Sequence, residues 1–187
     1  MKKEPFLEPV LRKLRIRKII RHIPRGSCLC DFGCGTQALF LNTIKSSLSS
    51  GIGLDLRLQP QGDKKIALIQ CDIDGNVPLK PNTFDVVTSL AVLEHLNNPV
   101  NNLRETHRIL KKDGLLILTT PTPASKKVLE FLAFRLGVLS RDTIGEHKQY
   151  FDKTSIRNAL IGAGFENEKI KITSFQMGFN MLVVAKK

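Results

Sequence analysis

One short stretch, residues 27–41, constrains the fold of this chain more than any other part of the sequence. Its first six residues are largely apolar, which is typical of a buried parallel strand. Gly33 and Gly35 then allow a tight turn in which the backbone can approach a ligand closely. A helical pattern follows from Thr36, and the start of a helix has unpaired backbone N–H groups that bind electron-rich ligands. The stretch therefore predicts a cofactor site at the glycine turn.

Two classes of cofactor fit this outline. The segment from Gly33 to Ala38 satisfies the loose dinucleotide pattern G-x-G-x-x-G/A, and Asp55 lies at about the distance expected for an acid that binds a ribose. Asp31, however, lies two positions before the first glycine, where its carboxylate would repel a pyrophosphate. S-adenosylmethionine carries an ammonium group, a positive sulfonium, a ribose and an adenine, but no phosphate. Asp31 therefore favours S-adenosylmethionine over a dinucleotide.

Five segments resemble, in the right order, the motifs of class I S-adenosylmethionine-dependent methyltransferases. They are Asp31-Phe-Gly-Cys-Gly-Thr, Gly51-Ile-Gly-Leu-Asp, Gln70-Cys-Asp-Ile, the segment 84–96 and the segment 108–118. Five ordered motifs are far more specific than one glycine turn, and the resemblance extends from about Ser27 to the C-terminus. The sequence departs from the family at Gln37, where the family usually has a third glycine.

The resemblance implies a cofactor site built at the ends of successive strands. Asp31 would lie near the ammonium group, and Asp55 would accept hydrogen bonds from the ribose hydroxyls. Asp72 would accept one from the adenine amino group while Ile73 packs on the ring. Asp55 and Asp72 could also simply end their strands as turn or cap residues. The predicted cofactor-binding residues are Asp31, Gly33, Cys34, Gly35, Asp55, Leu56, Asp72, Ile73 and Leu90, with S-adenosyl-L-homocysteine as the product.

Two histidines are candidates for removing a proton from the methyl acceptor, because histidine titrates near neutrality. His95 follows Glu94 just after a predicted strand, where open α/β sheets bind ligands. His147 follows the predicted lid over the substrate. The segment also resembles a set of residues that holds a metal in some relatives, and Glu94, His95 and His147 match three of its positions. Ala91 replaces a glutamate of that set, so we predict no metal site.

Strand and helix patterns alternate along the chain, which predicts a parallel sheet covered by helices on both faces. The expected fold class is α/β, with a Rossmann-like, seven-stranded, mostly parallel sheet and an antiparallel last strand, in a single domain 1–187. The resemblance implies this last strand, which NAD-binding Rossmann folds lack. Strands are expected at 28–32, 51–55, 66–71, 84–89, 114–120, 169–175 and 179–185, and helices at 36–48, 99–110, 126–139 and from 152.

Two segments outside the predicted sheet bear on the partners of this chain. Residues 121–150 are predicted to form a substrate-side lid, whose apolar helix would meet a lipid-like acceptor. Residues 1–25 form a basic arm with nine Lys and Arg against two Glu, in a chain of net charge +12. Such an arm could pack on the domain, or meet an anionic membrane or RNA.

The sequence favours an enzyme that methylates a small or lipid-like acceptor at oxygen. No stretch is long and apolar enough to span a bilayer and no signal peptide is visible, so we expect a cytoplasmic protein, at most peripheral at the membrane. We expect all four cysteines to be reduced thiols. Two alternatives stay open: an RNA methyltransferase, suggested by the charge, and a cofactor-binding protein without turnover, suggested by Gln37.

Overall fold

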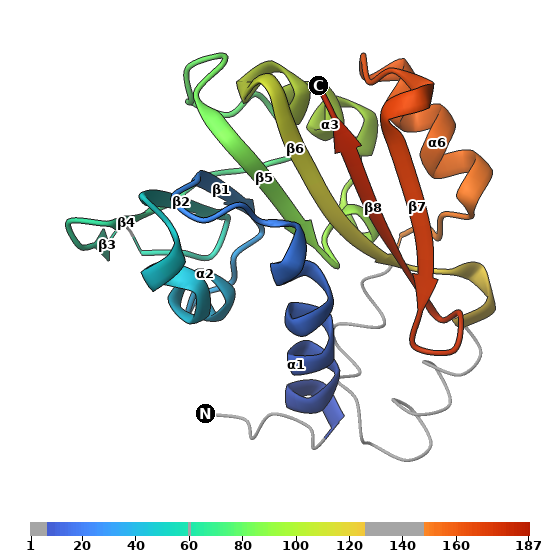
Figure 1. Ribbon diagram of the computed structural model, residues 1–187, viewed down its shortest axis with the longest axis horizontal. Coiled ribbons are helices and arrows are strands. Elements are labelled where there is room, and N and C mark those ends of the chain that lie inside the picture. The colour runs from blue at the N-terminus through green and yellow to red at the C-terminus, as the bar shows by residue number, and fades with distance from the viewer. Residues whose placement is uncertain (1–6, 60, 126–147) are drawn as a thin grey trace.

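A computed structural model describes residues 7–59, 61–125 and 148–187 (Figure 1). The strands among these residues are β1 (Cys28–Phe32), β2 (Ser50–Asp55), β3 (Gln61–Gly62), β4 (Ile66–Gln70), β5 (Phe84–Leu90), β6 (Leu110–Pro121), β7 (Ile170–Phe175) and β8 (Asn180–Lys186). They form one sheet in the order β3-β4-β2-β1-β5-β6-β8-β7. The carboxyl ends of the central strands therefore meet at one edge of the sheet, where ligands of open α/β folds bind.

The pairing of the strands confirms the predicted architecture. β4, β2, β1, β5 and β6 are paired in parallel, and β8 runs antiparallel between β6 and β7. The seven expected strands are present, and the short strand β3 adds an eighth, antiparallel to β4 at the edge. A two-residue strand has no alternation to detect in the sequence, so β3 was not predicted.

Helices cover both faces of this sheet. Those among the described residues are α1 (Leu7–Ile19), α2 (Leu39–Ile44), α3 (Pro99–Ile109) and α6 (Lys153–Gly162), with 3₁₀ turns η1 (Ile20–His22), η2 (Lys45–Ser47), η3 (Leu93–His95), η4 (Pro123–Ser125) and η6 (Asn167–Lys169). None of these helices is long and apolar enough to cross a membrane. The helix expected at 126–139, and most of the predicted lid, lie outside the described residues.

Local capping explains where α3 and α6 begin. The side chain of Asn98 accepts a hydrogen bond from the N–H of Asn101 at 3.1 Å, and Pro99 occupies the first turn of α3, as expected. Asp152 and Ser155 exchange backbone and side-chain hydrogen bonds in a capping box at the start of α6.

Two predicted boundaries were wrong. The helix expected at 36–48 begins only at Leu39, because Ala38 adopts the left-handed conformation with φ 44°. Thr36 and Gln37 therefore belong to the glycine turn, and the hydrophobic spacing on which the prediction relied does not reveal a left-handed residue. β6 begins at Leu110, directly after α3, where the prediction placed a turn that delayed the strand to 114.

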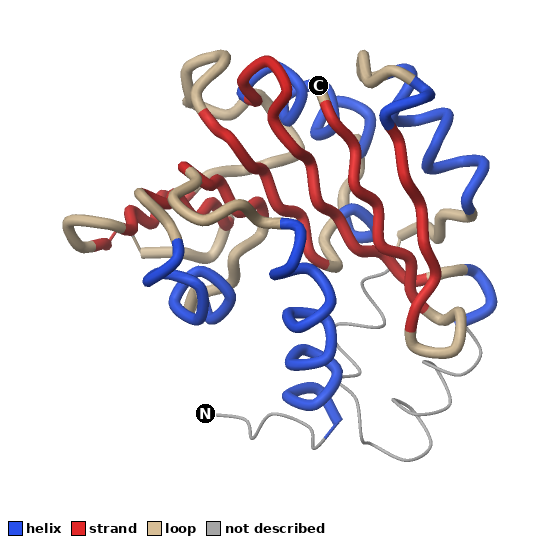
Figure 2. The backbone as a smooth tube through the Cα atoms, in the orientation of Figure 1, coloured by secondary structure: helices blue, strands red, loops and turns tan. Residues whose placement is uncertain are grey.

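Alternating side chains divide the core into two layers, one on each face of the sheet. One layer joins Leu29 of β1 to Ile19 of α1 and Leu41 of α2. The other layer joins the next residue of β1, Cys30, to Leu103 of α3. Figure 2 shows α1 and α2 apart from α3 and α6, with the sheet between the two pairs.

Candidate functional site

The glycine turn after β1 is held open by backbone geometry. Gly33 has φ 70°, and its N–H donates to the carbonyl of Leu54 at 2.7 Å. A Cβ at Gly33 would lie 2.4 Å from Val92 Cγ2, so only glycine fits there. Gly35 also has positive φ, but a Cβ there would meet no atom within 4 Å. Gly35 thus leaves bare backbone facing open space, as a close-lying ligand requires.

Asp55, at the end of β2, is fixed against this turn. One carboxylate oxygen accepts a hydrogen bond from the N–H of Gly35 at 3.0 Å, and the other accepts one from the N–H of Arg57 at 2.9 Å. Two backbone donors hold the carboxylate in one orientation before any ligand binds.

A cavity of about 590 Å³, the Asp55 cavity, opens on one side of the turn. It contains Asp72, which is exposed, and Ile73, which is buried beside it. Leu56 is 61% exposed and adds a second apolar wall. The lining residues are Gly33, Gly35, Asp55, Leu56, Arg57, Asp72, Ile73, Asp74, Ala91, Val92, His95, Leu96, Asn97 and Lys148.

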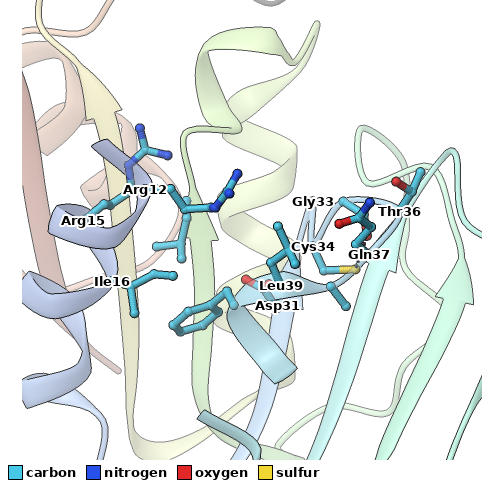
Figure 3. Close-up of a pocket in the computed structure, with 13 residues that line it drawn as sticks. Arg12, Arg15, Ile16, Asp31, Gly33, Cys34, Thr36, Gln37 and Leu39 are labelled. Carbon is cyan, nitrogen blue, oxygen red and sulfur yellow. Dashed lines mark hydrogen bonds between the residues drawn. The ribbon is translucent and has the colours of Figure 1, made fainter. Parts of the chain in front are cut away.

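A second cavity of about 600 Å³, the Asp31 cavity, opens on the other side of the turn (Figure 3). Figure 3 shows α1 on one side of this cavity and the glycine turn on the other. Its lining residues are Arg12, Arg15, Ile16, Asp31, Gly33, Cys34, Gly35, Thr36, Gln37, Ala38, Leu39, Phe40 and Leu90. Gly33 and Gly35 line both cavities, so the two adjoin the same turn and are together called the crevice.

The crevice brings together the three predicted acids. Asp55 and Asp72 line one half, and Asp31 lines the other. The other predicted cofactor-binding residues, from the glycine turn to Leu90, also line it. This grouping is the arrangement that the sequence prediction required, while the role of each residue toward a ligand stays a prediction.

Asp31 is the most buried of the three acids, with 3% of its surface exposed. Thr88 Oγ1 donates a hydrogen bond to its carboxyl group at 2.6 Å. Burial raises the pKa of Asp31 to about 7, against the lowering effect of the Thr88 hydrogen bond, and the charge of Asp55 raises it further. A cation bound next to Asp31 would restore its full negative charge at neutral pH.

The N-terminal helix contributes site residues that the sequence prediction missed. Arg12, Arg15 and Ile16 of α1 line the Asp31 cavity. Residues 1–25 were interpreted only as a basic arm. The sequence feature that could have indicated these site residues is helical spacing. Arg12 and Arg15 precede Ile16 and Ile19 by one helical turn and therefore share their inward face.

Glu94 is almost completely buried, at 1% exposure, in the 3₁₀ turn after β5. Thr120 Oγ1 donates to its carboxyl group at 3.2 Å, and its backbone carbonyl accepts the N–H of Lys148 at 2.9 Å. Burial raises the pKa of Glu94 to about 7, although hydrogen bonding and the charge of Arg15 act in the opposite direction. Glu94 thus connects β5, β6 and the chain at Lys148.

The two histidine candidates have different outcomes. His95 lines the Asp55 cavity, on the side of Asp72 and not among the residues of the Asp31 cavity. His147 lies outside the described residues. Among the residues that the structure does describe, no three His, Cys, Asp or Glu side chains are placed to hold a metal ion. Because His147 is not included, the predicted absence of a metal stays a prediction.

Comparison with known proteins defines the class. A profile of the family described as "Methyltransferase domain" matches residues 6–170 of this chain. The chain therefore belongs to the methyltransferase domain family, and the predicted class I resemblance is confirmed. The same comparisons confirm S-adenosylmethionine as its cofactor.

Among curated relatives, the chain is similar to a malonyl-[acyl-carrier protein] O-methyltransferase of Laribacter hongkongensis, with 34% identity over 79% of this chain and 52% of that protein. It is also similar to a ubiquinone biosynthesis O-methyltransferase of Aliivibrio fischeri, with 27% identity over 51% of this chain and 44% of that protein. The chain thus spans about half the length of the curated relatives it matches.

A solved S-adenosylmethionine-dependent methyltransferase from Archaeoglobus fulgidus superimposes with a TM-score of 0.70. The alignment covers 95% of this chain and 94% of that chain at 18% sequence identity. At this identity the similarity establishes the fold alone, and it confirms the predicted Rossmann-like sheet.

Proposed function

We propose that this chain transfers a methyl group from S-adenosylmethionine to an oxygen atom of a small or lipid-like acceptor. The observation that carries the proposal is the glycine turn between two cavities, with acids on both sides. Two relatives whose names specify O-methylation support oxygen as the methylated atom.

The residues of the Asp55 cavity fit the nucleoside half of the cofactor. The two oxygens of Asp55 each hold one backbone donor and retain lone pairs for the ribose hydroxyls. Leu56 and Ile73 supply apolar walls for a flat adenine ring, and Asp72 supplies an acceptor beside it. The open space beside Gly35 leaves room for the ligand to pass from one cavity to the other.

The residues of the Asp31 cavity fit the reacting half. The cofactor supplies a methyl group already activated by a positive sulfur, so the protein's tasks are to orient the acceptor and exclude water. Asp31 would pair with the ammonium group of the amino-acid end. Leu39, Phe40 and Leu90 provide apolar surface for an acceptor.

The proposal is tested by cofactor binding and turnover. Wild-type protein should bind S-adenosylhomocysteine in calorimetry, and Asp55→Ala should weaken binding by about tenfold or more, because both ribose contacts are lost. Transfer of a labelled methyl group to carboxylate and phenol acceptors measures turnover. Binding with no transfer across such acceptors would favour the non-catalytic alternative, and no binding at millimolar cofactor would contradict the proposal.

We also propose that the outer face of α1 makes peripheral contact with an anionic lipid surface. Val10 and Leu14 are 47% and 48% exposed, next to the exposed cations Lys13 and Arg17. This combination of apolar and basic side chains favours a lipid surface over RNA. The protein should sediment together with phosphatidylglycerol vesicles and should stay in the supernatant with phosphatidylcholine vesicles. Binding to RNA but to neither vesicle would instead support the RNA alternative.

A further inference from the structure

A buried hydroxyl group lies beneath the Asp31 cavity. Thr88 of β5 is fully buried and is not among the lining residues of either cavity, so it has no direct access to a bound cofactor. It reaches the site through Asp31, because Thr88 Oγ1 donates to Asp31 Oδ1 at 2.6 Å. We propose that Thr88 is a positioning residue, whose hydroxyl holds Asp31 as a carboxylate in one orientation for the ammonium group of the cofactor. This inference rests on the proposed function and adds a residue to its binding site.

The parallel pairing of β1 and β5 places the two side chains next to each other. Asp31 and Thr88 are partners in the strand register, as are Leu29 and Val86 two residues earlier on each strand. Leu29 and Val86 belong to the same core layer, so by alternation Asp31 and Thr88 project toward that same face of the sheet. Leu90, two residues after Thr88, lines the Asp31 cavity. Thr88 therefore lies one step of the strand pleat below the cavity.

A hydroxyl donor suits a carboxylate that must later bind a cation. Burial disfavours the ionised form of Asp31, and the hydrogen bond from Thr88 lowers the pKa of this group against the effect of burial. A lysine or arginine in place of Thr88 would also stabilise the ionised form, but its positive charge would compete with the ammonium group. A neutral donor leaves the negative charge in place, and the carboxyl oxygens keep lone pairs for the ammonium N–H groups.

The distances around Thr88 indicate which form of Asp31 it favours. The hydroxyl has a second acceptor in the carbonyl of Cys30, but at 3.5 Å instead of 2.6 Å. A protonated Asp31 would donate to Thr88 itself, and the hydroxyl proton would then have only the distant Cys30 carbonyl. The short contact to Asp31 is therefore fully used only when Asp31 is ionised.

Other charged and titratable groups around Asp31 come from β1, β2, the glycine turn and α1. Among the described residues they are Cys30, Asp55, Cys34, Arg12 and Arg15. Burial raises the pKa of Cys34 to about 12 and that of Cys30 well above its ordinary value, so both thiols stay neutral near pH 7. All five groups are the same in wild type and in a variant of Thr88, so a comparison of the two isolates the hydroxyl.

Thr88→Val tests the inference, because valine has nearly the shape of threonine and lacks the hydroxyl. Calorimetry compares its affinity for S-adenosylhomocysteine with that of wild type at pH 7 and at pH 8.5. At pH 7 the variant should bind about fivefold more weakly, since more of its Asp31 is protonated. At pH 8.5 the two proteins should agree within about twofold, since Asp31 is then largely ionised in both. The comparison at each pH cancels the titration of the amino group of the ligand.

Three controls separate this role from packing. 5′-Methylthioadenosine lacks the amino-acid end, so wild type and Thr88→Val should bind it equally at both pH values. Thr88→Ser keeps the hydroxyl and should bind S-adenosylhomocysteine within about twofold of wild type. Thr106→Val makes the same exchange in α3, where the hydroxyl is buried and has no hydrogen-bond partner among the described residues. It should bind both nucleosides like wild type.

Three results would overturn the positioning role. One is unchanged S-adenosylhomocysteine affinity in Thr88→Val at pH 7. The second is a loss of equal size at both pH values or for both nucleosides, which would assign Thr88 to packing alone. The third is a failure of Thr88→Ser to restore binding. A wild-type protein that binds neither nucleoside would instead overturn the proposed function, so the two failures are distinguishable.

Discussion

Asp31 is subject to opposite requirements from folding and from binding. Its burial disfavours the ionised form, whereas an ammonium ligand needs that form. Because its pKa in the folded protein is raised above the unfolded value of 3.8 to about 7, folding is favoured at low pH and the contribution is lost as pH rises toward 7. At pH 8 the free protein therefore carries an ionised, buried Asp31, which lowers the free energy of unfolding until a bound cation compensates the charge.

Asp31→Asn should separate these two effects. The amide oxygen can still accept the hydrogen bond of Thr88, and the buried charge is gone. We expect the free energy of unfolding in urea at pH 8 to rise by on the order of 2 kcal/mol. Affinity for S-adenosylhomocysteine should fall by about tenfold, measured by calorimetry. Unchanged affinity would show that Asp31 does not face the ammonium group.

Gly33 and Gly162 form a matched pair for testing the glycine turn. Alanine at Gly33 combines a positive φ with a Cβ 2.4 Å from Val92, so Gly33→Ala should lower the free energy of unfolding by on the order of 2–4 kcal/mol. Gly162, at the end of α6, has open space around it, and Gly162→Ala should stay within about 0.5 kcal/mol of wild type. Equal stability of the two variants in urea denaturation would contradict the strain assigned to the turn.

At the scale of elements, Asp74 ties the segment after β4 to the start of α3. Its carboxylate accepts from the N–H and the side-chain amide of Asn97, both at 3.0 Å, and from the N–H of Asn98 at 2.9 Å. The N–H of Asp74 in turn donates to the side chain of Asp72 at 2.9 Å. Asp72, the acid predicted to lie beside the adenine, is thus positioned through a neighbour that anchors a helix.

Asp74→Ala should therefore affect both stability and binding. Loss of three hydrogen bonds should lower the free energy of unfolding by on the order of 1–3 kcal/mol and weaken S-adenosylhomocysteine binding severalfold. Asp63→Ala is the control, because Asp63 also accepts two backbone N–H groups but lines neither cavity. The control should lose stability and keep its affinity. Loss of affinity in both variants would point to general loosening of the fold.

The position of α1 shows what an element contributes beyond its own pattern. Its basic composition is visible in the sequence, and Ile16 and Ile19 mark a face that packs on the domain. That this face also carries Arg12 and Arg15 to the crevice depends on where α1 packs against the domain. Helical periodicity states which residues share a face, but not which surface that face meets.

At the scale of the whole molecule, the pH dependence of stability near neutrality includes a contribution from two buried carboxyl groups among the described residues. Burial raises the pKa of Asp31 and Glu94 to about 7, so the folded state binds more protons than the unfolded state in this range. Stability must then rise as pH falls. Burial lowers the pKa of His22 and His107, so these histidines oppose the trend, most strongly below about pH 6.5 and only weakly above pH 7. Burial raises the pKa of the Cys34 thiol, which therefore acts in the alkaline range.

We therefore expect the free energy of unfolding of the free protein to increase between pH 8 and pH 6.5. Urea denaturation at pH 8.0, 7.25 and 6.5 measures it, and the Asp31→Asn, Glu94→Gln double variant should remove most of the slope. Saturating S-adenosylhomocysteine should flatten the wild-type slope as well, since its ammonium compensates Asp31. A slope of opposite sign in the free wild type would show that these carboxyl groups ionise freely.

Much of the fold could be predicted because its signals are local. The run from Cys28 to Phe32, the glycines after it and the Asn98-Pro99 start of α3 each express preferences of a few neighbouring residues, and the structure has all three where expected. The five ordered motifs also identified the three acids that line the crevice, Asp31, Asp55 and Asp72. The prediction failed where one backbone angle decided the outcome, as at Ala38.

What only the tertiary structure decided is which distant residues meet. Thr88 donates to Asp31 across 57 residues of sequence, and Arg12 enters the same cavity from a helix that no motif includes. His95, one of the two candidate bases in the sequence, lines the Asp55 half of the crevice. The sequence by itself determined the order of strands and helices and the acids at the strand ends, because periodicity and turn chemistry act over short range. Burial, charge and the shape of the Asp31 cavity depend on packing between segments far apart in the chain, and only the folded sheet brings those segments together.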